Sequence, residues 1–237
     1  MKILGIDSSG LTASVAVVED DIVIGEYNIN FRKTHSQTLL PMLDELSGMI
    51  SLDAATIDGI AVSEGPGSFT GLRIGSAMVK GLARAWEKPI IPVPTVDALA
   101  YNMYGSSDLI CPIMDARRNQ TYTGLYEFVP EGDGYKMNVL LDRRAVDLGA
   151  IMAEVNASGR RTVFLGDGVP VFAEQLREEV RVEYSFAPAF MNRQRAAALA
   201  VLAASYMREG RTCTAAEHAP VYLRMSQAER ERMESGQ

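Results

Sequence analysis

Hydrophobic and polar positions divide the chain into short segments that alternate between strand and helix character. Residues 1–7 are mostly apolar, residues 12–18 alternate, and residues 22–31 form a third segment of strand character. Next comes THSQTLLPMLDELSGMI, residues 34–50, where leucines recur at the spacing of an amphipathic helix. Pro41 lies inside this segment. Because proline removes one backbone donor, it predicts a kink or the true start of the helix.

The alternation continues through the rest of the first half. Strands are predicted over residues 57–63 and 90–93, and helices over residues 70–86 and 96–104. A glycine-rich turn separates the first of these strands from the first of these helices.

At Leu109 the pattern restarts. LICPIMDARRNQTYTGLYEF repeats the order found in KILGIDSSGLTASVAVV: an apolar strand, an aspartate, a short polar turn and an alternating strand. This similarity predicts a weak internal duplication. A strand over residues 163–165, a helix over residues 169–180 and an alanine-rich helix within residues 193–210 complete the second half.

Two βββαβα-like units in tandem predict an α/β fold with two lobes, the arrangement of the actin, hexokinase and Hsp70-like ATPase (ASKHA) superfamily. The N-terminal lobe is expected to span residues 1–109. The C-terminal lobe is expected to be reduced and to span residues 110–214, with a C-terminal segment of about 215–237 packing back on the first lobe.

Composition narrows the classes of protein further. The 237 residues carry a net charge of −7, and residues 1–110 hold 7 basic and 13 acidic side chains, so the chain lacks the basic stripe of a dedicated nucleic-acid binder. No apolar run is long enough to span a membrane. The two cysteines are far apart and the two histidines form no H-x-x-x-H pair, which excludes a helical two-histidine metal site. A cytoplasmic protein without a metal is expected.

The first candidate site is the turn at the end of the first strand. Asp7, Ser8 and Ser9 precede Gly10, and such a turn can hold a nucleotide phosphate through its backbone N–H groups and position a hydrated cation with its carboxylate. Asp115 holds the matching place in the second half. A plain hairpin turn explains the same residue types equally well, because Asp, Ser and Gly favour turns.

The second candidate site is EGPGSFTGLRIG, residues 64–75. Gly65, Pro66 and Gly67 favour a tight turn, and Ser68 or Thr70 can cap the helix that follows. The free N–H groups of a helix start can bind an anion. However, the sequence lacks the lysine of a P-loop and does not match the dinucleotide-binding pattern. A rigid strand-to-helix turn is therefore the favoured interpretation.

Six motifs in order resemble the bacterial TsaB (YeaZ) family: ILGIDSS, HSQTLLPML, AVSEGPGSFTGLRIG, KGLA, DARRNQTY and APVYLR. The resemblance runs from Ile3 to Arg224. It implies a two-lobed ASKHA-like fold and an accessory, non-catalytic role in placing threonylcarbamoyl on the adenosine next to the anticodon of tRNAs that read ANN codons. One departure is Gln120, where the family often has Glu.

The resemblance also implies partners. The catalytic partner is a TsaD-type paralogue with a metal-binding histidine pair, and the matching stretch here, residues 95–103, contains no histidine. A TsaE-type ATPase is a further expected partner, tRNA is contacted only through the complex, and a homodimer is expected when the chain is alone. The chain is expected to have no cofactor of its own beyond weak ATP or ADP binding. The alternative is a small nucleotide-binding protein or ATPase of the same superfamily that acts alone.

In this family the two helices after HSQ and after the glycine turn form a bundle with the partner. On this basis the expected interface residues are His35, Leu39, Leu43, Leu46, Leu72, Gly71 and Gly75. The glycines would allow helices to approach closely. The leucines fit equally well on a helix face that packs against the chain's own sheet.

Overall fold

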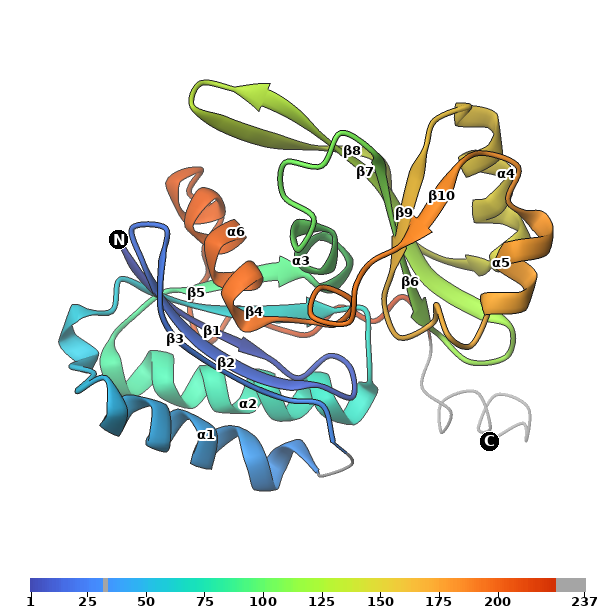
Figure 1. Cartoon of the computed structure of the whole chain (residues 1–237). Helices are drawn as coiled ribbons and strands as arrows, with labels where there is room; N and C mark the ends of the chain where they lie inside the picture. The colour runs from blue at the N-terminus through green and yellow to red at the C-terminus, as the bar shows by residue number, and fades with distance from the viewer. Residues whose placement is uncertain (32–33, 225–237) are drawn as a thin grey trace, which may run out of the picture.

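The computed structural model describes residues 1–31 and 34–224. It contains two five-stranded mixed sheets, each with helices on both sides (Figure 1). The first sheet contains β1 (Lys2–Asp7), β2 (Ala13–Glu19), β3 (Ile22–Ile29), β4 (Gly59–Gly65) and β5 (Ile90–Pro94). The second contains β6 (Leu109–Asp115), β7 (Gln120–Glu131), β8 (Gly134–Asp147), β9 (Thr162–Leu165) and β10 (Tyr184–Phe186).

The two sheets repeat one topology, which confirms the predicted internal duplication. The first has the order β3-β2-β1-β4-β5, and the second, counted from its opposite edge, has the matching order β8-β7-β6-β9-β10. In both sheets the first three strands pair antiparallel and the last two join in parallel. Two such α/β units in one chain define the ASKHA arrangement that the pattern of elements predicted.

Each sheet has its own pair of helices on its outer face. Helices α1 (His35–Met49) and α2 (Phe69–Trp86) cover the first sheet, and α4 (Leu148–Ser158) and α5 (Ala173–Glu179) cover the second. A short 3₁₀ turn, η1 (Ala54–Thr56), leads into β4. The remaining helices, α3 (Thr95–Tyr101) and α6 (Ala196–Arg208), lie between the sheets (Figure 1).

Each of the two inner helices packs on the sheet formed by the other half of the chain, which differs from a simple division at residue 109. α6 comes from the second half but packs on the first sheet, and α3 comes from the first half but packs largely on the second. The start of α6 explains its position, because Ser14 of β2 and Glu26 of β3 accept hydrogen bonds from its first two backbone N–H groups, at 2.7 Å and 3.0 Å. Residues 196–208 therefore pack on the first sheet, although they fall within the range expected for the second lobe.

The predicted elements of the first half lie close to the observed ones. Pro41 lies within α1 and does not mark its start, because the helix begins six residues earlier at His35. The helix expected from residue 169 begins at Ala173. Strand β8 and helix α4 were not predicted. Within the described residues, no helix is long and apolar enough to cross a membrane.

Candidate functional site

The turn after β1 is closed, and its polar groups bond to one another. Asp7 is 1% exposed and accepts hydrogen bonds from the backbone N–H of Ser9 at 2.9 Å, from its hydroxyl at 2.7 Å and from the hydroxyl of Ser63. Burial raises the pKa of Asp7 above its ordinary value, although these hydroxyls act in the opposite direction. Ser8 is also buried and donates its hydroxyl to the carbonyl of Gly71 at 2.8 Å.

The start of helix α2 packs directly on the turn after β1. The backbone N–H of Ser68 donates to the carbonyl of Ser9 at 2.7 Å, so the start of the helix bonds directly to the turn. A Cβ on Gly67 would lie closer than 3.0 Å to that same carbonyl oxygen. The prediction that Asp7, Ser8 and Ser9 bind a nucleotide is therefore not supported by their positions, because none of them faces open space.

The glycine turn is a rigid connection, as the favoured interpretation of the sequence held. Gly65 has φ +118°, a conformation that favours glycine, and Pro66 follows it. The Ser68 side chain caps α2 by accepting a hydrogen bond from the Gly71 N–H at 3.2 Å. Thr70, the other predicted cap, lies within the helix and is exposed.

Gly71 and Gly75 serve contacts within the chain. A Cβ at either position would lie closer than 3.0 Å to Ser8, to its carbonyl oxygen in the first case and to its hydroxyl in the second. Both glycines are buried. The absence of a side chain at both positions lets α2 lie against the turn after β1, and their role at a partner interface stays a prediction.

The predicted interface leucines also face inward. Leu39, Leu43 and Leu46 of α1, together with Leu72 of α2, are at most 4% exposed. The first three pack with β1, β2 and β4 in one cluster. This outcome is the alternative that the sequence left open, namely a helix face packed on its own sheet. His35 is half-buried, and its Nε2 donates to the carbonyl of Gly10 at 2.9 Å, which ties the start of α1 to the turn after β1.

An open groove nevertheless runs between α1 and α2. Its volume is about 390 Å³, and its walls are almost entirely apolar. Leu40 is 59% exposed, and Gly81 has no atom within 4 Å of the position of a Cβ. The lining residues are His35, Ser36, Leu39, Leu40, Ile74, Ala77, Met78, Gly81 and Leu82. The two helices predicted to form the interface thus present an open apolar groove. Of the predicted interface residues, only His35 and Leu39 line it.

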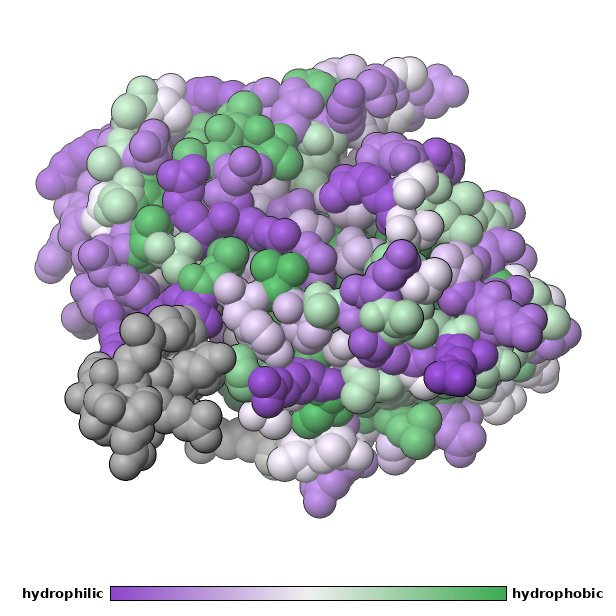
Figure 2. Space-filling model, turned by 180° about the vertical axis from the view of Figure 1, so that it is seen from behind, coloured by the Kyte–Doolittle hydropathy of each residue, from purple (hydrophilic) through white to green (hydrophobic). Residues whose placement is uncertain are grey.

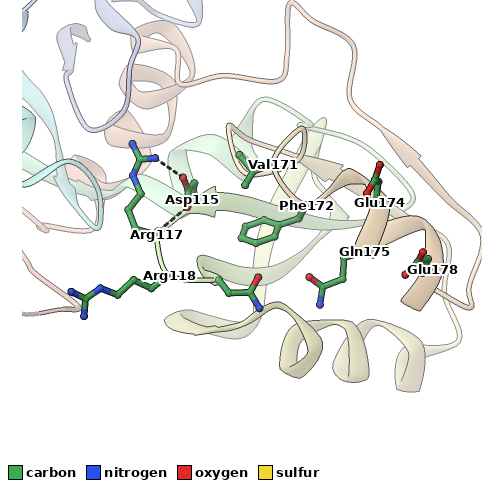
Figure 3. A pocket seen from close by; sticks show the side chains of 9 residues that line it. Asp115, Arg117, Arg118, Val171, Phe172, Glu174, Gln175 and Glu178 are labelled. Carbon is green, nitrogen blue, oxygen red and sulfur yellow. Dashed lines mark hydrogen bonds and ion pairs between the residues drawn. The ribbon is translucent and has the colours of Figure 1, made fainter.

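Asp115 lies in a loop that is more open than its counterpart at Asp7. Its carboxylate pairs with the Arg117 guanidinium at 3.1 Å and accepts from the Arg117 N–H at 2.7 Å (Figure 3). Three consecutive residues, Arg117, Arg118 and Asn119, have positive φ between 56° and 65°. The backbone of Gln120 closes this loop through hydrogen bonds with Ala116 and Arg117.

A pocket of about 520 Å³ opens beside this loop. Figure 3 shows Phe172 and three polar side chains of α5 along its far side. Glu174 and Glu178 add two carboxylates to that of Asp115, which opposes the binding of a polyphosphate despite the two arginines. Asp7 and Asp115 end strands of different sheets, and nucleotide binding by the two together stays a prediction.

The two sheets and the end of the described chain meet at Glu64, which the sequence did not single out. Its carboxylate pairs with Arg143 of β8 at 2.6 Å, and its carbonyl accepts from the Val221 N–H at 2.7 Å. Residues 213–224 run along the first sheet to this point, where Tyr222 stacks on Phe69 with ring centroids 4.4 Å apart. The sequence predicted that residues of about 215–237 pack back on the first lobe. Residues 225–237 of this segment lie outside the described residues.

The segment that matches the histidine-bearing helix of the resembled catalytic paralogue is buried between the sheets. Within it, Asp97 accepts hydrogen bonds from Tyr126 at 2.7 Å and from Tyr206 at 3.1 Å. Burial raises the pKa of Asp97, and these two hydroxyls oppose that effect. Within residues 1–31 and 34–224, no group of three or more His, Cys, Asp or Glu side chains is placed to hold a metal ion.

These features define a class: a duplicated α/β protein of the ASKHA arrangement in which the turn after β1 is packed against the start of α2. The family model described as "TsaD: tRNA N6-adenosine threonylcarbamoyltransferase" matches residues 29–232. The chain is 31% identical over 239 residues to the tRNA threonylcarbamoyladenosine biosynthesis protein TsaB of Bacillus subtilis, with 99% of both chains covered. It is also 34% identical over 130 residues to the TsaB protein of Escherichia coli, which covers 54% of this chain and 55% of that one.

Solved structures agree with the sequence relatives. YeaZ from Pseudomonas aeruginosa superposes with a TM-score of 0.78 at 25% identity, covering 94% of this chain and 99% of that chain. The chain belongs to the family that this model describes and, within it, to the TsaB (YeaZ) proteins.

Proposed function

We propose that this chain is a non-catalytic accessory subunit of the machinery that forms threonylcarbamoyladenosine next to the anticodon in tRNAs that read ANN codons. It binds and activates a catalytic TsaD-type paralogue. Membership of the TsaB family supports the pathway. The observation that carries the binding role is the open apolar groove between α1 and α2, since grooves of this kind accept an amphipathic helix of a partner.

The closed turn after β1 supports a role without catalysis by this chain. An ATPase of this fold acting alone would need open backbone N–H groups and a free carboxylate near the phosphates. Here the buried Asp7 carboxyl already accepts three hydrogen bonds from within the chain. Any binding of ATP or ADP by the isolated chain is therefore weak.

The remaining partners follow from the same role. A TsaE-type ATPase joins the complex in the cytoplasm, and tRNA is held through the complex, because this chain has a net charge of −7. When the paralogue is scarce, the groove is buried against a second copy of the chain, and a homodimer forms.

Light scattering coupled to size-exclusion chromatography tests the proposal. The chain is run alone and with the TsaD-type protein of the same organism, and the mixture is assayed for threonylcarbamoyladenosine on a tRNA transcript. Leu40→Asp places a charge in the groove and is expected to weaken the complex at least tenfold and to reduce modification in proportion. Val171→Asp is the matched control, because Val171 is 60% exposed against 59% for Leu40 and lies outside the groove.

The two variants separate the outcomes. Loss of the complex with Leu40→Asp alone supports the groove as the binding surface. An undiminished complex would reject the groove while leaving the family role standing. Absence of any complex with the unmodified chain would reject the accessory role itself.

A further inference from the structure

A second cleft lies on the inner side of the molecule and shares no lining residue with the groove between α1 and α2. Its volume is about 820 Å³. The β7–β8 hairpin extends beyond the second sheet and overhangs α6 (Figure 1). Residues of β8 and of α6 both line the cleft. In the space-filling view from behind, a mostly hydrophilic projection at the top overhangs the body of the molecule with a gap below it (Figure 2).

Two walls of this cleft carry regularly spaced side chains. On the hairpin, Tyr135, Met137 and Val139 alternate along β8, so they share one face of the strand. On α6, the lining positions Ala198 and Val201, followed by Ser205 and Arg208, share one face at intervals of three or four residues. Short side chains at 198 and 205 leave room between a strand face and a helix face. The resulting shape is a slot suited to a flat group.

Aromatic rings line the inner end of the slot. The rings of Tyr104 and Tyr135 meet edge to face with centroids 5.6 Å apart, and Tyr101 lies 5.3 Å from Tyr104. Among the described residues, the hydroxyl of Tyr101 has no hydrogen-bond partner, although its side chain is half-buried. Burial, with smaller contributions from Tyr104 and Asp21, raises the pKa of Tyr101 to about 12, so the hydroxyl stays protonated and can donate.

Three of the positively charged side chains around the slot form ion pairs, and one does not. Arg195 pairs with Glu26, Arg211 with Glu209 at 3.6 Å, and Lys136 with Glu131 at 3.8 Å. In contrast, the guanidinium of Arg208 forms no ion pair or hydrogen bond within residues 1–31 and 34–224. It is close enough to Tyr101 to act on its titration. One unpaired cation and one unpaired hydroxyl donor therefore line a cleft whose other charged groups are mostly paired, beside its aromatic and aliphatic residues.

We propose that this cleft binds a small molecule with a flat, apolar or aromatic body and one anionic group, with the anion held by Arg208 and the Tyr101 hydroxyl. The flat body lies between the hairpin face and α6. The Arg208 side chain is exposed, and its guanidinium can donate charge-assisted hydrogen bonds to an anion, which are stronger than neutral ones. Asp21 also lies near Tyr101, and its carboxylate disfavours any ligand with more than one anionic group.

Paired fluorescent probes test the charge requirement in the full chain. Anilinonaphthalene sulfonate has a flat aromatic body with one negative charge, and phenylnaphthylamine has nearly the same body without it. The sulfonate is expected to bind the unmodified chain about tenfold more tightly than the neutral probe. Arg208→Gln is expected to weaken the sulfonate about tenfold and to leave the neutral probe within about twofold.

Three controls make the result specific. Arg84→Gln removes an exposed arginine near the end of α2 and is expected to change neither probe. Leu40→Asp tests whether the probes bind in the groove between α1 and α2 instead. Ala198→Trp fills the slot and is expected to abolish binding of both probes, with circular dichroism reporting whether the variant folds. The proposal is overturned if both probes bind the unmodified chain equally, if Arg208→Gln leaves the sulfonate unaffected, or if Leu40→Asp rather than Ala198→Trp abolishes binding.

Discussion

Substitution of Gly71 by alanine gives the sharpest test of how α2 meets the turn after β1. The added Cβ would lie closer than 3.0 Å to the carbonyl oxygen of Ser8, a backbone atom that a side-chain rotation cannot move. Either the helix or the turn must shift, and the hydrogen bond from the Ser8 hydroxyl to the Gly71 carbonyl, 2.8 Å long, is strained in both cases.

The expected magnitude combines three effects. Overpacking in a buried site costs about 1–3 kcal/mol, and a weakened buried hydrogen bond adds about 1 kcal/mol. Replacing glycine in a helix returns up to about 1 kcal/mol. The net loss is about 2 kcal/mol, which lowers the melting temperature of a chain of this length by about 4–8 °C.

Gly81→Ala is the matched control because Gly81 lies in the same helix and has nothing within 4 Å of the added Cβ. It retains only the gain in helix propensity, so the melting temperature is expected to rise by about 2–4 °C. Thermal unfolding followed by circular dichroism, with urea midpoints as a second measure, compares the two variants with the parent. A Gly71→Ala variant as stable as the Gly81→Ala variant would refute the close contact between α2 and the turn.

Two further predictions concern the same region. Ser68→Ala removes the cap of α2 and should lower the free energy of unfolding by about 1 kcal/mol, whereas Thr70→Ala should change it by no more than a few tenths; equal urea midpoints for the two variants would contradict the assigned cap. Asp7 has a pKa above the ordinary 3.8, so the native state holds its proton to higher pH than the unfolded state does. Its contribution to stability should then fall as pH rises above about 4. Asp7→Asn removes this titration, and the parent should lose stability relative to the variant between pH 4 and the raised pKa; parallel urea profiles would show that Asp7 does not titrate in this way.

Much of the fold could be predicted because strand and helix patterns are local. The strands of the first sheet, the helix after the glycine turn and the duplication at Leu109 were all visible in short windows of the sequence. Strand β8 was not, because YKMNVLLDRRAVD mixes charged and apolar positions on a strand that lies at a sheet edge and is largely exposed. Apolar and polar residues alternate only over YKMNV at its start, and no residue of the strand is fully buried, so the segment has no clear strand signal along its whole length.

The positions of the inner helices could not be predicted from local pattern. An alanine-rich helix such as α6 is apolar on most sides, so its sequence does not specify which sheet it covers. Its place depends on Gly5 of β1, where a Cβ would lie 2.5 Å from the carbonyl of Ala196, and on the two acceptors from β2 and β3. These contacts join residues more than 160 positions apart, and nothing in a short window indicates them.

The candidate interface on α1 also could not be predicted from local pattern alone. Helical spacing correctly found Leu39, Leu43 and Leu46 as one apolar stripe of α1, but it did not indicate whether that stripe faces the sheet or a partner, and it left out Leu40, which lines the groove. Leu39 and Leu40 are adjacent, and a rotation of about 100° per residue separates an inward from an outward direction. Only the packing of α2 beside α1 makes Leu40 part of a groove.

Asp7 and Asp115 occupy equivalent positions in the two units, yet the turn after Asp7 is closed and the loop after Asp115 is open. Asp7 and Asp115 both end the first strand of a unit, and a glycine turn packs on each of these strand ends: Gly67 against Ser9, and Gly166 against Ile113. In the first unit α2 begins at once after the turn, and its Ser68 N–H bonds to the turn after β1. In the second unit α5 begins only at Ala173, so the loop after Asp115 remains open beside a pocket. The distance along the chain between glycine turn and helix therefore decides which of the two equivalent loops is closed.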